Sequence, residues 1–217
     1  MPWFILICGP NGAGKSTLTG AKAFQDQLRN FPGGPAKLFN PDDFARVHYA
    51  SNPGKTWTEA NLWAATQVPS DVRRCIDAGE NVAVETVLSS DKFISIIEHA
   101  HRRAYQVGMI YLALESAAVS MSRVARRVAA GGHDVPEDRI RPRWRRSLDN
   151  LIKFTPLVDG RLVYQSSSSK GLTLLAEKFE GNVLWYGGKK FPALHLRLGA
   201  RKSPKPGPRT GGMPSLG

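Results

Sequence analysis

The amino-acid sequence predicts an α/β domain with a mainly parallel sheet flanked by helices. Three observations support this fold class. Short runs rich in β-branched and aromatic residues alternate with longer stretches of helical periodicity. The run Trp3–Cys8 is apolar throughout, as is typical of a strand that is buried on both faces. A glycine-rich turn follows this run and leads into a predicted helix.

The first half of the chain is predicted to hold two strands and two long helices. Pro/Gly-rich stretches and an acidic turn separate them, and Pro69 is expected to kink the second helix. After the strand at residues 3–8, the predicted elements are a helix from about 15 to 29, a break at 31–35, a strand at 37–40, an acidic turn at 41–43 and a helix from about 57 to 78.

The second half continues the alternation. A strand at residues 81–85 delivers Glu85 and Thr86 to its carboxyl end, where ligands bind in open α/β sheets. The remaining predicted elements are helices at 91–103, 116–130 and 136–153, a strand at 107–114, a glycine break at 131–133, and late, edge-type strands at 162–164 and 183–185.

Length and composition favour one folded domain with a basic tail. The chain has 217 residues, of which 41% are apolar and 22% charged, as in ordinary globular proteins. We expect residues 1–186 to form the domain and the Pro/Gly/Ser-rich residues 187–217 to remain disordered. Seven basic residues and no acid lie in that tail, and they account for much of the net charge of +12. Nucleic acid is therefore expected as a partner only through the tail.

Other classes of protein are disfavoured by what the sequence contains. Cys8 and Cys75 lack the spacing of a zinc site and are expected to be core thiols. The run Trp3–Cys8 is too short for the core of a signal peptide, and no stretch approaches the roughly 20 apolar residues of a membrane span. We therefore expect a cytoplasmic protein.

A phosphate-binding loop is the strongest signal in the chain. The motif GxxxxGK[ST] lies between a predicted strand and a predicted helix, which is the context it requires. Lys15 is expected to reach the β- and γ-phosphates of ATP, and Ser16 to ligate Mg²⁺. Thr17 either assists or packs in the first helical turn. The expected nucleotide-binding residues are Gly9, Pro10, Asn11, Gly12, Ala13, Gly14, Lys15, Ser16 and Thr17.

Motifs that are missing narrow the class of P-loop protein. The sequence holds neither the NKxD motif of GTPases nor an LSGGQ-like signature of ABC ATPases. No apolar run ends in the Asp-Glu pair with which motor ATPases activate water. A P-loop kinase that transfers phosphate to the hydroxyl of a small molecule remains as the best interpretation.

Two acidic segments supply candidates for the chemistry of such a kinase. A hydroxyl acceptor needs a carboxylate that takes its proton, and Asp42 follows the second strand at the edge of the P-loop. Asp43 is the competitor, although we expect it to cap a helix that begins near Phe44. Glu85 is expected either to hold the acceptor or to organise Mg²⁺ through water, with Thr86 as a second substrate contact. Ser89 and Ser90 are expected to cap the following helix.

An arginine-rich segment at about 123–146 is predicted to form a helical lid. Arg123 and Arg127 are four residues apart, so they share a helical face, and glycines that follow them suggest a hinge. We expect Arg127 to act in catalysis, and Arg123 and Arg143 to bind phosphates of the substrate. His133, beside the hinge, either contacts substrate or packs the lid. For the other arginines of the segment, a solvated helix face is expected.

Together these segments resemble the zeta-toxin family of P-loop kinases. The matching pieces are GPNGAGKST at 9–17, NPDDFA at 40–45, ETVLS at 85–89 and the arginine-rich stretch at 123–151, in family order. The resemblance implies ATP-dependent phosphorylation of an amino sugar or nucleotide sugar such as UDP-N-acetylglucosamine, with ATP and Mg²⁺ as cofactors. It also implies an antitoxin protein as a possible partner. By motif, Asp42 is the base, Lys15 and Ser16 bind ATP and Mg²⁺, and Glu85 helps to hold the acceptor.

Three alternatives stay open at the level of sequence. The acceptor could be another small metabolite or an antibiotic, because kinases of such compounds share the P-loop and the lid. A polynucleotide kinase or another nucleic-acid-associated ATPase is supported only by the basic tail. A module that merely senses nucleotide would bind ATP without turnover.

Overall fold

The computed structural model describes residues 1–132, 135–167, 171–179, 182–186, 191, 194–198 and 201–202. Within these residues, eight strands form a single sheet. The strands are β1 (Trp3–Cys8), β2 (Ala36–Phe39), β3 (Asn81–Thr86), β4 (Gln106–Ala113), β5 (Gly160–Ser167), β6 (Gly171–Phe179), β7 (Asn182–Trp185) and β8 (Arg201–Lys202).

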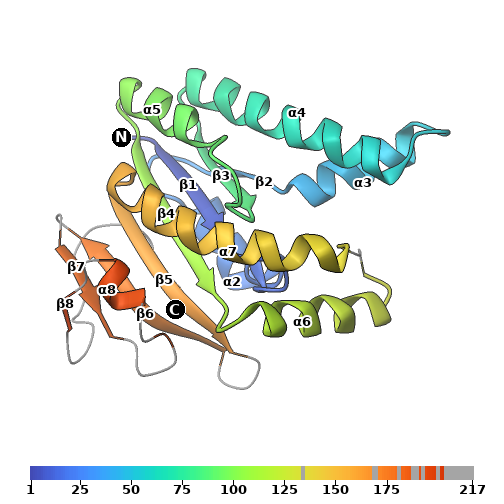
Figure 1. Cartoon of the computed structure of the whole chain (residues 1–217). Helices are drawn as coiled ribbons and strands as arrows, with labels where there is room; N and C mark the ends of the chain where they lie inside the picture. Colours follow the sequence, from blue (N-terminus) through green and yellow to red (C-terminus); the bar gives the residue numbers. More distant parts are fainter. Residues whose placement is uncertain are drawn as a thin grey trace.

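Helices flank this sheet on both faces (Figure 1). The described helices are α1 (Lys15–Gly20), α2 (Lys22–Arg29), α3 (Pro41–Ser51), α4 (Trp57–Asp77), α5 (Ile94–Arg102), α6 (Ala117–Ala129), α7 (Glu137–Phe154), the 3-10 turn η1 (Thr155–Leu157) and α8 (Leu194–Arg197). None of them combines the length and the apolar composition that crossing a bilayer requires, within the part of the chain that the structure describes.

The sheet has a parallel half and an antiparallel extension. Its strand order is β2-β3-β1-β4-β5-β6-β7-β8, and the first five strands of this order run parallel. Cys8 at the end of β1 stands beside Thr86 of β3 and Tyr111 of β4, so the carboxyl ends of three strands meet at one edge. The hairpin β6–β7 then extends the sheet with antiparallel pairing. The predicted α/β fold class is thereby confirmed.

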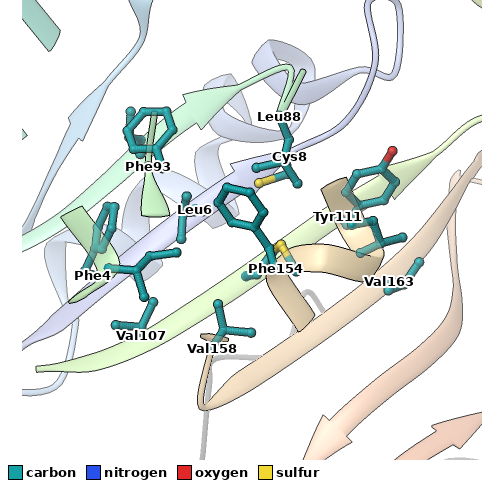
Figure 2. Close-up of a cluster of buried hydrophobic side chains, with 14 of the residues drawn as sticks. Phe4, Leu6, Cys8, Leu88, Phe93, Val107, Tyr111, Phe154, Val158 and Val163 are labelled. Atoms are coloured by element: carbon teal, nitrogen blue, oxygen red, sulfur yellow. The ribbon is translucent and has the colours of Figure 1, made fainter. Parts of the chain in front are cut away.

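Two apolar layers enclose the sheet because alternate residues of each strand point to opposite faces. Phe4, Leu6 and Cys8 of β1 pack into the larger layer beneath α4, α5 and α7, whereas Ile5 and Ile7 pack against α2. Figure 2 shows the larger layer, in which Phe154 at the end of α7 lies among side chains of β1, β4 and β5. Both cysteines are buried and free, as expected.

Several predicted boundaries differ from the structure for local reasons. The helix expected over residues 15–29 is interrupted at Ala21, whose extended backbone (φ −66°, ψ 136°) separates α1 from α2. Helix α3 begins at Pro41, because Asn40 caps it and proline suits the first helical position. The expectation that Asp43 caps this helix is therefore wrong. Ser89 and Ser90 do not cap α5 either, since its N-cap is Phe93.

The strands after α7 were the least well predicted. β6 was missed altogether, and β5 is longer than the expected strand at residues 162–164. The strand expected at 183–185 is present as β7. The expectation that these late strands lie at an edge is wrong, because β5 lies between β4 and β6, and β7 lies between β6 and β8. Interruption by polar residues, as in β5 and β6, hides such strands from a search for apolar runs.

Part of the C-terminal tail packs against the domain. Phe191, Leu194 and Leu198 are buried in the larger apolar layer, and Arg197 forms an ion pair with Asp149 of α7 at 2.7 Å. The folded part of the chain therefore continues beyond the boundary expected at residue 186. Most of residues 187–217, on which we expected disorder, lie outside the described residues.

Candidate active site

The glycine-rich loop connects β1 to α1 at the carboxyl edge of the sheet. Gly9, Gly12 and Gly14 all have positive φ (148°, 75° and 87°), a region that other residues rarely adopt. A Cβ atom at Gly9 would lie 2.5 Å from the carbonyl oxygen of Leu112, so no side chain fits there. The strand, loop and helix follow one another as the motif requires.

Lys15 lies at the start of α1 with its ammonium group turned toward the loop. Its Nζ donates to the carbonyl oxygen of Gly9 at 2.8 Å and to that of Pro10 at 3.3 Å. Burial lowers the pKa of Lys15, and the positive charge of Arg127 lowers it further. The negative charges of Glu85 and Asp42 act in the opposite direction. The ammonium group of Lys15 is thus held by the loop carbonyls, within the electrostatic influence of two carboxylates and one arginine.

Glu85 is a buried carboxylate at the end of β3, with only 3% of its surface exposed. Three side chains donate hydrogen bonds to it: Ser16 (Oγ to Oε2, 3.0 Å), Thr19 (Oγ1 to Oε1) and Asn40 (Nδ2 to Oε1, 3.3 Å). Burial raises the pKa of Glu85, and the hydrogen bond from Thr19 and the charge of Lys15 act in the opposite direction. Glu85 therefore joins the loop helix α1 to the start of α3.

Asp42 lies on the first turn of α3 and is exposed to solvent. Its backbone N–H donates to the side chain of Asn40 at 3.0 Å, which fixes the start of the helix. The carboxylate forms no hydrogen bond or ion pair with another described residue, yet its charge influences both Lys15 and Arg143. Asp43, the alternative base, is instead paired with Arg46 one turn further along.

Thr86 and Thr17 make weaker cases as ligand-binding residues. Thr86 is 9% exposed, and its hydroxyl accepts a hydrogen bond from the backbone N–H of Leu88 at 3.1 Å. It thereby supports a turn in which Leu88 has a positive φ of 57°. Thr17 is exposed on the first turn of α1.

Arg123 on α6 ties the loop to the end of β5. Its guanidinium donates to the carbonyl oxygen of Gly12 at 3.3 Å and to both the side chain and the carbonyl of Ser166, each at 3.0 Å. Ser120, one turn earlier on α6, donates to the carbonyl oxygen of Asn11. These bonds hold the outer side of the loop, so Arg123 acts as a support of the loop in this structure.

Arg127 lies one turn after Arg123 and has no such partners. Its Nε and Nη2 atoms are buried without a hydrogen-bond partner. A buried guanidinium that is left unpaired costs free energy, about 1–3 kcal/mol or more for a charged group. Gly132 lies against it, because a Cβ there would approach the Cγ of Arg127 to 2.6 Å. Among the arginines of the predicted lid, Arg127 is therefore the one whose Nε and Nη2 atoms are buried without a partner in the described part of the chain.

Arg143 on α7 is half-buried and close enough to Asp42 to interact electrostatically. Burial and the neighbouring Arg139 and Arg146 lower its pKa, and the carboxylate of Asp42 opposes this. None of the eight arginines of the predicted lid forms an ion pair with an acidic residue in the described part of the chain. His133 lies outside the described residues.

Sequence reasoning missed residues whose role depends on their neighbours in space. Asn40 and Thr19 hold Glu85, whereas Ser120 and Ser166 support the loop. Asn40 had a usable signal, since Asn followed by Pro and two Asp residues is typical of a helix start. Ser166 had none, because it lies over 150 residues from the loop it contacts through Arg123.

Comparison with known proteins places the chain in a family. A family model for the zeta toxin matches residues 1–168, which include the loop, both acidic segments and the arginine-rich helices. The chain belongs to the zeta toxin family.

Solved structures share the fold across most of the chain. The toxin–antitoxin system PezAT of Streptococcus pneumoniae matches with a TM-score of 0.61 at 18% identity, over 91% of this chain and 78% of that one. The AvrRxo1-ORF1:-ORF2 complex with ATP matches with a TM-score of 0.60 at 15% identity, over 91% of this chain and 64% of that one. An uncharacterized protein of Haemophilus influenzae is 24% identical over 140 residues, 64% of this chain and 91% of its own.

Proposed function

We propose that this zeta toxin family member is an ATP-dependent kinase that phosphorylates a hydroxyl group of an amino sugar or nucleotide sugar. One observation carries the proposal. Asn40 caps the helix turn that carries Asp42 and also donates to Glu85, which accepts from Ser16 next to the P-loop lysine Lys15. Neither the carboxylate of Asp42 nor the Nε and Nη2 atoms of Arg127 are engaged by another described residue. A proton acceptor and unpaired cations around a P-loop are what phosphoryl transfer to an alcohol requires.

The loop and α1 supply the binding of ATP in this proposal. Backbone N–H groups of the glycine-rich loop and the positive end of α1 suit the phosphate oxygens. Lys15, now bonded to two loop carbonyls, has the reach to turn toward the β- and γ-phosphates. The hydroxyl of Ser16 beside the carboxylate of Glu85 is an oxygen-rich position that fits Mg²⁺. When bound, Mg²⁺ would neutralise charge on the β- and γ-phosphate oxygens.

Asp42 acts as the general base. It accepts the proton of the acceptor hydroxyl as that oxygen forms its bond to the γ-phosphorus, while the bond from the γ-phosphorus to the β-γ bridging oxygen breaks and ADP leaves. Glu85 is less suited to that role, because three hydrogen bonds from Ser16, Thr19 and Asn40 already engage it. Its place in the proposal is to orient Ser16, and with it the metal.

The lid arginines stabilise the transferring phosphoryl group. Arg127 contributes the unpaired Nε and Nη2 atoms, which gain hydrogen bonds only when an anion is present. Arg143 faces Asp42 from α7 and is placed to contact the acceptor or its phosphates. Arg123 keeps the loop in shape through Gly12 and Ser166.

The nature of the acceptor and of the partners rests on the family. Membership of the zeta toxin family supports an amino-sugar nucleotide such as UDP-N-acetylglucosamine. The solved PezAT system is described as a chromosomal toxin–antitoxin pair, which supports an antitoxin partner here as well. A cytoplasmic location is the one in which ATP, such an acceptor and such a partner would meet.

The direct test is ADP release with ATP, Mg²⁺ and a panel of acceptors. We expect UDP-N-acetylglucosamine to stimulate ADP release, with a phosphorylated sugar nucleotide found by mass spectrometry. Asp42→Asn should lower turnover by roughly 10²–10⁴-fold without loss of ATP binding. Asp43→Asn is the matched control, because its carboxylate is exposed and paired with Arg46; it should retain activity.

Other outcomes identify the competing functions. Stimulation by a different hydroxyl compound, with none by the nucleotide sugar, would replace the acceptor. A polynucleotide acceptor would reveal itself by activity that falls steeply with salt. Equal ATP binding and unchanged ADP release in Asp42→Asn would indicate a nucleotide sensor and contradict the kinase.

A further inference from the structure

Exposed aromatic side chains gather on the helical pair α3–α4. Five of the seven large apolar side chains with high exposure lie on these two helices, and the other two, Met1 and Val128, lie elsewhere. The five are Val47, Tyr49, Trp57, Leu62 and Trp63, with exposed fractions of 37–68%. Helix α3 begins directly after β2 and carries Asp42 on its first turn, so these side chains and the proposed base belong to the same helix pair (Figure 1).

The rings are already arranged as stacks. Tyr49 and Trp57 lie 4.6 Å apart with an angle of 9° between their planes, and each is 40% exposed. His48 and Trp63 lie 4.1 Å apart at 13°. Stacking between the two helices fixes the ring orientations, so a further flat ring can join a stack with little ordering of side chains.

The Tyr49–Trp57 stack is aligned with the proposed base. Asp42 and Tyr49 are seven residues apart on α3, two helical turns, so they share one face of the helix at a separation of about 10 Å along its axis. Trp63 of the second stack is exposed to a similar extent, but this stack continues into Phe44, which packs against the larger apolar layer. The second stack also involves His48, which is six residues from Asp42 and so does not share its helical face.

Two cations of α7 are within electrostatic range of the proposed base or of each other. The carboxylate of Asp42 acts on Arg143, and so does Arg139, which lies one helical turn before Arg143. Helices α3 and α7 run in opposite directions in Figure 1. Neither arginine has an acidic partner within the described part of the chain.

We propose that Tyr49 and Trp57 form a subsite that stacks on a flat heterocyclic ring at the far end of the acceptor. The acceptor then has its reacting hydroxyl at Asp42, an anionic linker near Arg143 and Arg139, and the ring about 10 Å from the hydroxyl. This inference rests on the proposed function for the position of the hydroxyl, but the stacking surface can be tested by binding alone. Tyr49 and Trp57 are specificity-determining residues in this proposal.

The experiment measures binding and turnover separately. Uridine diphosphate is titrated calorimetrically into protein whose P-loop is saturated with a non-hydrolysable ATP analogue, so that the probe does not occupy the ATP site. N-acetylglucosamine 1-phosphate, which lacks the ring, is the second probe. The variants are Tyr49→Ala and Trp57→Ala, with Leu62→Ala as the matched control, because Leu62 is 68% exposed on the same helix pair.

We expect Tyr49→Ala and Trp57→Ala to weaken binding of uridine diphosphate roughly tenfold, as loss of one stacking platform does. Binding of the ring-free probe, the KM for ATP and kcat at saturating UDP-N-acetylglucosamine should stay within about twofold. Leu62→Ala should match the unmodified protein in every measurement. Circular dichroism on all three variants verifies that α3 and α4 remain folded.

Each other result has a defined meaning. Turnover with unchanged binding of uridine diphosphate in both variants overturns the subsite and leaves the kinase intact. Ring binding lost in the variants without phosphoryl transfer by any of the proteins supports the subsite and overturns the proposed function. Equal loss for both probes, or a change in oligomeric state by light scattering, overturns the subsite in favour of a structural or interface role.

Discussion

The floor and the lid of the site differ in how their charges are paired. On the floor, Glu85 accepts three hydrogen bonds, and Lys15 donates to two carbonyl oxygens of the loop. On the lid, the Nε and Nη2 atoms of Arg127 are buried without partners, and Arg143 is flanked by other arginines. The charged groups of the floor are therefore paired within the protein, whereas two guanidinium nitrogens of Arg127 on the lid have no partner among the described residues.

This difference separates stability from activity. Removing a floor side chain leaves its partners unpaired in a buried setting, which lowers the free energy of unfolding. Removing a lid arginine relieves an uncompensated charge, so stability should change little while catalysis suffers. Mutations of the floor should thus lower mainly the free energy of unfolding, whereas mutations of the lid should lower mainly kcat.

The largest effect is expected from Arg127→Ala in the lid. Loss of its guanidinium should lower kcat about a thousandfold, because an arginine that stabilises the transferring phosphoryl group contributes on that scale. The free energy of unfolding without ATP should change by less than about 1 kcal/mol or increase, since the buried Nε and Nη2 atoms have no partners to lose. Steady-state kinetics and urea unfolding measure the two quantities.

Arg126→Ala is the matched control for this substitution. Arg126 is the preceding residue on α6 and is exposed. Its variant should retain turnover within about threefold. A comparable loss in both variants would mean that the positive charge of the helix as a whole matters, and the distinction between floor and lid would not hold at Arg127.

An intermediate effect is expected from Glu85→Ala on the floor. The substitution leaves Ser16, Thr19 and Asn40 without their acceptor. We expect the free energy of unfolding to fall by about 1–3 kcal/mol, in contrast to Arg127→Ala. Thermal or urea unfolding in the absence of ATP is the measurement. Unchanged stability would show that the network of Glu85 matters only when ligand is bound.

The smallest effect is a pH dependence that the floor should show. Burial raises the pKa of Glu85 above its ordinary 4.5, so the folded protein holds this proton more tightly than the unfolded chain does. The contribution to stability is therefore fully present below pH 4.5 and is lost as the pH rises through the raised pKa. Relative to Glu85→Gln, which cannot titrate, the unmodified protein should lose stability over that window.

Urea unfolding of both proteins in steps from pH 4 to pH 8 measures this difference. The slope cannot exceed about 1.4 kcal/mol per pH unit, the value for a single proton. A constant difference across the range would show that the carboxylate is ionised equally in both states. In that case the hydrogen bonds from Thr19 and Ser16 and the charge of Lys15 would balance the effect of burial.

Local signals explain which parts were predictable. The run Trp3–Cys8, the loop and the helix at Lys15 carry their structure in neighbouring residues, and all three were predicted. The two helices α6 and α7 were predicted from helical periodicity, and the break between them from the glycines that separate them. By contrast, β6 and the support of Gly12 by Arg123 and Ser166 depend on contacts between distant parts of the chain. A single sequence holds no direct signal for such contacts.

The site shows the same division. Residue types at the edge of the sheet could be predicted, because parallel strands end together there. The partners of Glu85 could not, and the distinction between Arg123, which supports the loop, and Arg127, which has unpaired nitrogens, required the structure. Asp42 and Asp43 were adjacent candidates that the ion pair with Arg46 separates.

The packing of Phe191, Leu194 and Leu198 against the domain bears on how the chain can be shortened for experiments. A protein that ends after residue 186 would expose the apolar surface beside Trp185 that these residues cover. It would also remove the ion-pair partner of Asp149 on helix α7. Poor solubility of such a truncation would then reflect a missing piece of the domain. Ending the chain after Lys202 instead removes basic residues while it keeps those anchors in place.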